Sequence, residues 1–212
     1  MEAAKRESIL SEACKVFAKL GFQKASVDDI ARRAGVAKGT IYLAAPSKAD
    51  LFYEVLLREI RVWNAMLQKR IDPRRPADQL LTDLAMSSLM TMDDRPLVRD
   101  LLIGEHQEAL PELRDRLDEL RKIGIQPIVE VLEIGVEQGV FRDDLDVDEV
   151  ARILLDLHTA TVMFVVRKDR DPIRLARRSK SAFDLILRGL KAAPEKSEKS
   201  VRSHKHEKTK PK

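Results

Sequence analysis

Apolar residues recur every three or four positions along most of the chain, which is the spacing of one face of an α-helix. The first such stripe ends at Gly21, and the last follows Asp171-Pro172, a pair typical of a helix start. Between them the pattern predicts helices over residues 26–34, 37–43, 47–70, 76–92, 95–106, 111–138 and 146–167. Pro127 should kink the helix over residues 111–138. Because no strand-like alternation persists, the predicted fold is all-α.

Residues 26–43 predict two short helices separated by a tight turn. Ser26 and Asp29 form a capping pattern at the start of the first helix, and Gly35 ends it. The second helix ends before Pro46, because a proline disfavours helical geometry in the residue that precedes it. Two short helices joined in this way form a helix-turn-helix, which can place its second helix in the major groove of DNA.

A longer series of residues around this unit resembles a known family. Residues 6–51 are similar to the amino-terminal domain of the tetracycline-repressor (TetR) family of transcriptional regulators. The matching positions are Ile9-Leu10, Phe17, Gly21-Phe22, Ser26-Val27, Asp29-Ile30-Ala31, Ala34-Gly35-Val36, Lys38-Gly39-Thr40-Ile41-Tyr42 and Ser47-Lys48. The resemblance implies a three-helix DNA-binding domain over residues 1–51. It also implies a larger helical domain over residues 52–191 that dimerises and binds a small effector.

The distribution of charge is consistent with this division. Residues 1–51 contain nine lysines and arginines against six aspartates and glutamates, whereas residues 52–191 contain 23 against 26. Residues 192–212 contain seven against three and have few apolar side chains, so we expect a disordered basic tail. Basic ends favour a polyanionic partner. The tail itself is open to two interpretations, a solvated extension or a non-specific nucleic-acid arm.

Seven residues are candidates for DNA contact. They are Ser26, Val27, Lys38, Gly39, Thr40, Tyr42 and Lys48. Lys38, Thr40 and Tyr42 supply the hydrogen-bonding side chains of the second short helix, and such groups contact bases and phosphates. Gly39 would let that helix approach the groove closely, and Lys48 lies at the start of the next helix, where anions are favoured. The first two candidates lie where the family meets the DNA backbone, although Ser26 is also expected to cap a helix.

The resemblance is interrupted at Ala44 and Ala45, where the family usually has Tyr or His and then Phe. In the family the first aromatic residue contacts a phosphate, and the second packs the recognition helix onto the domain core. Replacing a buried Phe by Ala costs about 3–5 kcal/mol when nothing refills the space. Either Phe52 or Tyr53 fills this space, or the chain binds DNA poorly. An alternative function therefore stays open: a small-molecule-binding or protein-interacting dimer with weakened or lost DNA binding.

The larger domain is expected to bind a small apolar effector, and five residues are candidate lining. They are Trp63, Met66, Met86, Met90 and His106. Methionine side chains adapt to ligands of different shapes, and the kinked helix at Pro127 would border the same pocket. The methionines are equally compatible with ordinary core packing, and His106 with an exposed position. The chemical identity of the effector is not indicated.

The helix predicted over residues 146–167 is apolar on more than one face and therefore needs cover on several sides. Pairing it with the last helix and their two-fold mates predicts a homodimer built on an intermolecular four-helix bundle, as the resemblance also implies. A dimer carries two helix-turn-helix units, so its operator should be a double-stranded palindrome. The expected function is repression that a bound effector relieves.

The sequence favours a cytoplasmic regulator over an enzyme or a membrane protein. The longest apolar run, residues 162–166, is far shorter than the roughly 18 residues that a membrane-spanning helix needs. His158 lacks a second metal ligand at suitable spacing, so we interpret it as a core or interface residue. Cys14 lies on an apolar stripe and should be inert. We expect no catalytic residues, no metal and no cofactor.

Overall fold

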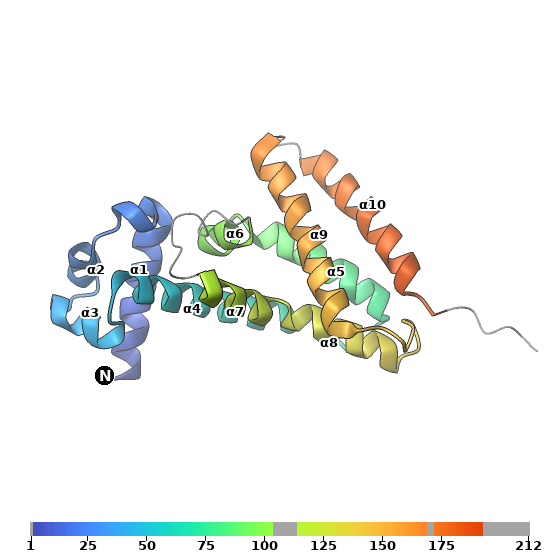
Figure 1. The fold of residues 1–212 in the computed structure, drawn as a ribbon, viewed down its shortest axis with the longest axis horizontal. Coiled ribbons are helices and arrows are strands. Elements are labelled where there is room, and N and C mark those ends of the chain that lie inside the picture. The colour runs from blue at the N-terminus through green and yellow to red at the C-terminus, as the bar shows by residue number, and fades with distance from the viewer. Residues whose placement is uncertain (1, 104–113, 169–171, 193–212) are drawn as a thin grey trace, which may run out of the picture.

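The computed structural model describes residues 2–103, 114–168 and 172–192, and ten helices cover most of them (Figure 1). The helices are α1 (Ala3–Lys24), α2 (Val27–Arg33), α3 (Lys38–Ala44), α4 (Lys48–Gln68), α5 (Ala77–Thr91), α6 (Pro96–Leu102), α7 (Arg114–Gly124), α8 (Gln126–Glu137), α9 (Val147–Lys168) and α10 (Pro172–Leu190). The all-α prediction is confirmed, and β pairing among the described residues is limited to one isolated bridge between Phe141 and Lys191. His106 and residues 193–212 of the expected tail lie outside the described residues.

Several helix boundaries follow from the caps that the sequence predicts. The Ser26 hydroxyl accepts a hydrogen bond from the Asp28 amide at 3.2 Å, and the Ser47 hydroxyl accepts one from the Asp50 amide at 3.0 Å. Each hydroxyl satisfies an amide that the first turn of a helix leaves without a partner. Gly21 has a φ of 70°, which breaks the helical conformation of α1 three residues before its last residue.

The expected kink at Pro127 is instead a boundary between two helices. α7 ends at Gly124 and α8 begins at Gln126, which places Pro127 in the first turn of α8. A proline fits there because the first turn does not use its missing amide proton. The predicted interruption is therefore present, but it lies at Ile125, two residues before Pro127, and it separates two helices rather than bending one.

The helices form two regions (Figure 1). The head consists of α1, α2, α3 and the first two turns of α4, and α1 packs against each of the other three. The body consists of the rest of α4 together with α5 to α10. α4 runs out of the head and continues through the body against α7, α8 and α5, while α9 and α10 lie side by side at the far side of the body. One continuous helix thus belongs to both regions.

A cluster of three aromatic side chains forms the centre of the head. The rings of Phe17 and Phe52 meet edge to face with centroids 4.9 Å apart, and the Phe22 ring lies 5.3 Å from that of Phe52. Phe17 and Phe52 are fully buried. Because they come from α1 and α4, the cluster fixes the angle at which α4 leaves the head.

At the opposite end of the body, the turn after α8 holds the end of α10. The ring of Phe141 lies directly over Gly135, at a distance where any side chain would collide with it. The Arg142 amide donates to the Leu190 carbonyl at 3.0 Å, and the Ala192 amide donates to the Val140 carbonyl at 3.2 Å. These contacts join the α8–α9 turn to the last residues of α10.

Candidate nucleic-acid interface and effector cavity

α3 has one buried face and one exposed face. Ile41 is 1% exposed and attaches the helix to the core of the head. On the opposite face Tyr42 and Leu43 are exposed by 44% and 79%, and Lys38 and Gly39 are exposed beside them. These exposed side chains are free to contact another molecule. Thr40 is half-buried between the two faces.

Lys38 is held by an acidic neighbour on α2. Its ammonium group lies 2.9 Å from a carboxylate oxygen of Asp28, and this hydrogen bond raises the pKa of Lys38. Both side chains are more than half exposed, so the ion pair contributes little to stability. Lys38 is therefore a cation that can exchange this partner for a phosphate at small cost.

Gly39 has no structural reason to be a glycine within this chain. A methyl group built on its α-carbon would meet nothing within 4 Å, and its φ does not fall in the left-handed region. Glycine inside a helix costs about 1 kcal/mol relative to alanine. The open space over Gly39 therefore suits the close approach of another molecule.

Lys48 has contacts inside the head. Its ammonium group donates to the carbonyl oxygens of Gln23 and Ala25 at 3.3 and 3.1 Å and lies 4.5 Å from the centre of the Phe22 ring. These contacts use two of its three donors and stabilise the last carbonyls of α1. The Ser26 side chain is exposed, whereas that of Val27 is buried and therefore not available to contact another molecule.

The two alanines that interrupt the family resemblance differ in burial, and the two aromatic residues expected to replace them have different neighbours. Ala45 is 2% exposed and belongs to the same buried core as Phe52, while Ala44 is half-buried. Tyr53 turns toward the body, where its hydroxyl donates to Glu119 at 3.4 Å and the Arg116 guanidinium lies 3.7 Å from its ring centre. Tyr53 therefore contacts α7, whereas Phe52 packs against Phe17 and Phe22 in the head.

A narrow apolar cavity of about 40 Å³ lies in the body. The residues that line it are Trp63, Leu67, Leu81, Leu84, Ala85, Ser88, Gly124, Pro127, Ile128, Leu154, Leu155, His158 and Phe183. They come from α4, α5, α8, α9 and α10, with the last residue of α7. None of these lining residues carries a charge at neutral pH. The cavity is thus an apolar space bounded by almost every long helix of the body.

Of the residues predicted to bind the effector, Trp63 lines this cavity. Pro127 lines it too, as expected from its place in the predicted helix. Met66 and Met86 are half-buried outside the lining, Met90 is 74% exposed, and His106 lies outside the described residues. Helical spacing could not separate these methionines, because it does not show which face of α4 or α5 borders the cavity.

Two polar residues in the wall were not predicted as ligands. The Ser88 hydroxyl and Nε2 of His158 lie 2.8 Å apart, linking α5 to α9, and both residues are buried. Burial lowers the pKa of His158 to about 4, so the imidazole is neutral at physiological pH. The burial of His158 agrees with its interpretation from the sequence as a core or interface residue. In the sequence, the one indication of a role for His158 was that a histidine stands in a strongly apolar helix.

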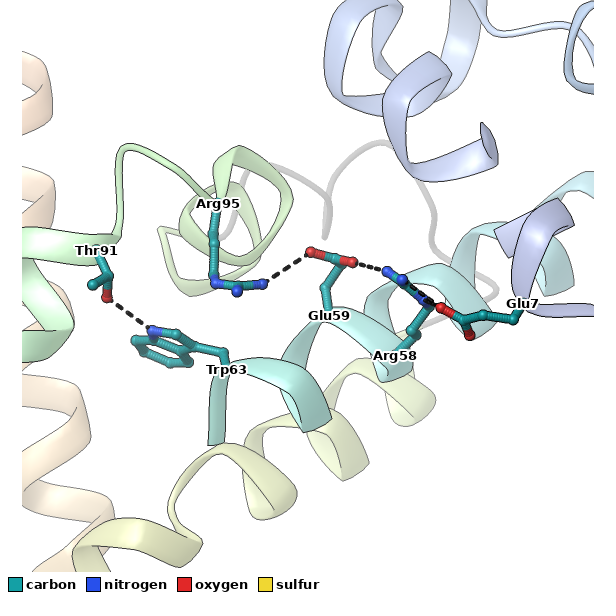
Figure 2. A network of polar contacts seen from close by, with 6 residues as sticks. All are labelled: Glu7, Arg58, Glu59, Trp63, Thr91 and Arg95. Atoms are coloured by element: carbon teal, nitrogen blue, oxygen red, sulfur yellow. Dashed lines mark hydrogen bonds and ion pairs between the residues drawn. The ribbon is translucent and has the colours of Figure 1, made fainter. Parts of the chain in front are cut away.

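A network of polar contacts joins the head to the body (Figure 2). Arg58 on α4 donates to Glu7 on α1 at 2.7 Å, and it also pairs with the neighbouring Glu59. On its other side the Glu59 carboxylate accepts from Arg95, immediately before α6, at 3.3 Å. Glu59 is only 9% exposed, so both arginines stabilise a charge that is removed from water.

Trp63 connects this network to the cavity. It lies one turn beyond Glu59 on α4, and its indole nitrogen donates to the Thr91 hydroxyl at the end of α5 at 3.2 Å (Figure 2). Thr91 and Arg95 bracket the short connection between α5 and α6. A residue of the cavity wall therefore contacts the segment that carries a partner of Glu59.

The described residues also bear on metal binding, membrane insertion and thiol reactivity. They contain no group of three or more His, Cys, Asp or Glu side chains placed to hold a metal ion, and none of their helices is long and apolar enough to cross a membrane. Burial, with the nearby Glu59 carboxylate, raises the pKa of Cys14 to about 11, so its thiol is protonated at neutral pH.

Known proteins resemble the chain in sequence and in fold. Residues 9–55 match the family described as bacterial regulatory proteins, tetR family. The HTH-type transcriptional repressor KstR2 of Mycolicibacterium smegmatis is 28% identical over 191 residues, which cover 89% of this chain and 91% of that protein. KstR2 of Mycobacterium tuberculosis is 31% identical over 159 residues, which cover 72% and 77% of the two chains.

A solved structure extends the resemblance to the body. It is the transcriptional regulator FadR from Bacillus subtilis in complex with stearoyl-CoA, which has a TM-score of 0.68 and 26% sequence identity. The match covers 87% of this chain and 98% of that chain. The family match over the head, the sequence identity with the relatives and the similarity in fold all lead to one conclusion. The chain belongs to the TetR family of bacterial transcriptional regulators.

Proposed function

We propose that the protein is a dimeric repressor that binds a palindromic operator through α3 and leaves it when a small apolar effector occupies the body cavity. The main support for this proposal is that α4 runs from the core of the head to the wall of the cavity. Leu51 and Phe52 of this helix are buried in the head, whereas Trp63 and Leu67 line the cavity. A ligand that moves the far end of α4 must therefore change the position of the head.

The exposed face of α3 supports DNA binding. Lys38, Tyr42 and Thr40 supply donors for bases and phosphates, and Gly39 allows close approach to the groove. The third donor of Lys48 would remain for a phosphate beside the start of α4. Ser26 and the main chain of Val27 would contact the backbone at the start of α2. A regulator of this kind would act in the cytoplasm, where its DNA lies.

The surface of α9 and α10 supports a homodimer. Ile153 and Leu157 lie one turn apart on α9 and are 49% and 42% exposed, and Leu185 on α10 is 73% exposed. Apolar side chains on two neighbouring helices suit an isologous interface with a second copy, in which four helices pack together. Two heads related by a two-fold axis would then read two half-sites of the operator.

The cavity supports an apolar effector, and acyl thioesters are the first class to test. Its volume of about 40 Å³ is far below the roughly 300–1,000 Å³ of a ligand pocket, so a ligand must enlarge it by separating the helices. The related FadR structure contains stearoyl-CoA, whose long acyl chain has the apolar character of this lining. Movement of Trp63 would reach Glu59 and Arg58 along α4, and Thr91 would transmit it to Arg95.

Selection from randomised duplex DNA followed by gel-shift titration tests the proposal. We expect a palindromic consensus bound as a dimer, with binding weakened when stearoyl-CoA is added. A duplex with one half-site scrambled is the matched control. By linkage, the operator must weaken stearoyl-CoA binding by the same factor. Selection of no consensus, with equally weak binding to every duplex, would contradict the proposal.

The alternative function, a small-molecule-binding dimer with weakened DNA binding, rests on Ala44 and Ala45. These alanines stand where the family places a phosphate contact and a packing aromatic residue. The selection experiment separates the two functions by whether any duplex is preferentially bound. The alternative requires Trp63 fluorescence to respond to apolar ligands while no duplex is preferred.

A further inference from the structure

The cavity contains a polar pair that its packing does not require. Ser88 and His158 hydrogen-bond to each other across the wall, and the side chains around them are predominantly apolar. Replacing both partners of a buried hydrogen bond by apolar groups of similar shape is often nearly neutral for stability. Both residues belong to the lining of the cavity, so a ligand that enlarges the cavity would lie against this pair.

The pair has more hydrogen-bonding capacity than the bond between its members uses. A serine hydroxyl has one donor and two acceptor sites, and a neutral imidazole has one donor and one acceptor. When Nε2 of His158 donates to Ser88, the hydroxyl proton of Ser88 is released to donate to a ligand carbonyl. When Ser88 donates instead, its oxygen still accepts from a ligand hydroxyl. The pair can thus adapt to one neutral polar group.

The same wall is unsuited to a charged group. None of the described residues that line the cavity is a lysine or arginine, and the His158 imidazole is neutral because burial lowers its pKa to about 4. A carboxylate at this position would lose its water without gaining a cation, which is strongly unfavourable. A ketone, ester or thioester would lose much less, because its carbonyl oxygen is uncharged.

We propose that Ser88 and His158 are the polar recognition site of the cavity, and that they select an apolar ligand with a neutral carbonyl group over the corresponding free carboxylate. This proposal rests on the cavity being the effector site. It adds a chemical class to the effector: a neutral carbonyl compound such as a ketone, an ester or the thioester of a fatty acid, but not the free acid.

Trp63 provides a direct measurement, because it is the single tryptophan of the chain and lines the cavity. The full-length protein is titrated at neutral pH with 2-decanone, decanoate and decane, and the fluorescence of Trp63 is followed. We expect 2-decanone to bind about tenfold more tightly than decane, in line with one hydrogen bond made in an apolar site. Decanoate should bind more weakly than both.

A matched set of variants separates recognition from packing. In the combined Ser88→Ala and His158→Leu protein, 2-decanone should lose its advantage of about tenfold while decane binds as well as before. His158→Gln keeps a donor and an acceptor and should retain part of the preference for the ketone. Thermal melting of each variant checks that the fold is intact, and the glutamine variant remains informative if the double variant does not fold.

Three results would overturn the assignment. Decanoate could bind as tightly as 2-decanone, the double variant could weaken decane and 2-decanone equally, or no probe could change the fluorescence of Trp63. Failure of the regulatory function is measured separately, by the absence of a selected operator or of its release by stearoyl-CoA. A protein that releases its operator but shows no ketone preference would retain the proposed function and contradict only the role of Ser88 and His158.

Discussion

The head carries its candidate binding groups on the surface, whereas the body carries its own in the interior. In the head a core of three phenylalanines fixes the helices, and the groups of α3 project outward. In the body the Ser88–His158 pair lies inside an apolar cavity between helices. A surface that reads DNA needs a rigid support, and a cavity that admits a ligand needs helices that can separate.

The two regions are joined by α4 and by the polar contacts around Glu59. Phe52 ties α4 to the head core, and Trp63 ties the same helix to the cavity. In the proposed function, a small rotation of α4 would displace α3 together with the head. Substitutions confined to one region should therefore separate the contribution of the head from that of the body.

The largest effect, on operator affinity, is expected from a substitution that disrupts the proposed dimer interface of the body. Leu157→Glu places a charge on the exposed apolar face of α9 and should convert the protein to a monomer in light scattering. Specific binding to a palindrome should then fall more than about 100-fold, because a monomer engages one half-site. Val62→Glu on α4 is the matched control, since Val62 is also 42% exposed. A dimeric Leu157→Glu protein would place the interface elsewhere.

The second prediction weakens the body from within. Gly135→Ala brings a Cβ to 2.0 Å from the Phe141 ring, and the rearrangement should destabilise the protein by about 1–3 kcal/mol. Gly189→Ala is the control, because a Cβ there meets nothing within 4 Å and alanine favours the helix. Thermal melting should show a lower midpoint for the first variant and an equal or higher midpoint for the second. Equal midpoints for both would show that Phe141 moves away without cost.

These two regions also differ in how far the sequence predicts them. The head depends on local signals: Ser26 and Ser47 cap helices, Gly35 ends one, and the α3 candidates are neighbours in the sequence. Its helices were therefore predicted nearly to their boundaries. The seven DNA contacts stay predictions, and the contacts of Lys38 and Lys48 within the chain could not be foreseen, since they depend on how α1, α2 and α4 pack.

The cavity could not be assembled from the sequence because its walls are distant along the chain. Ser88 and His158 are 70 residues apart, and Trp63 and Phe183 come from α4 and α10. Helical periodicity shows that a helix has an apolar face, but several such faces compete for the same core. Met90 illustrates the difficulty, because its spacing fits a buried stripe and yet it is exposed.

The third prediction concerns the dependence of stability on pH. The pKa of His158 is lowered by burial, so between about pH 6.5 and pH 4 the unfolded chain binds a proton that the folded chain does not. The stability contributed by the neutral imidazole is therefore present above the unfolded pKa and is lost as pH falls, by up to about 1.4 kcal/mol per pH unit. His158→Gln should flatten this part of the curve in denaturant titrations. A curve that keeps its slope would assign it to other groups.

The fourth prediction tests whether the open space over Gly39 is used by DNA. Gly39→Ala should raise the thermal midpoint slightly, since alanine is favoured in a helix by about 1 kcal/mol. It should also weaken operator binding about tenfold, because the added methyl group separates α3 from the groove. Stability and affinity moving in opposite directions would be the signature of a surface shaped for a partner. A stabilised protein with unchanged affinity would remove Gly39 from the interface.

The smallest effect is expected at Ala44, the last residue of α3. Ala44→Tyr restores the hydroxyl with which the family contacts a phosphate, and it should tighten binding several-fold on every duplex, about 0.5–1.5 kcal/mol per contact. Sequence preference should not change, because phosphate contacts position a protein without reading bases. The salt dependence of binding should change little, since a neutral hydroxyl releases no counterion. Ala44→Phe is the matched control, because it adds the ring without the hydroxyl. If both variants bind DNA with the affinity of the parent chain, an aromatic side chain at position 44 adds nothing to DNA binding by the head. The alternative function would then lose its main support, provided that the parent chain has a selected operator.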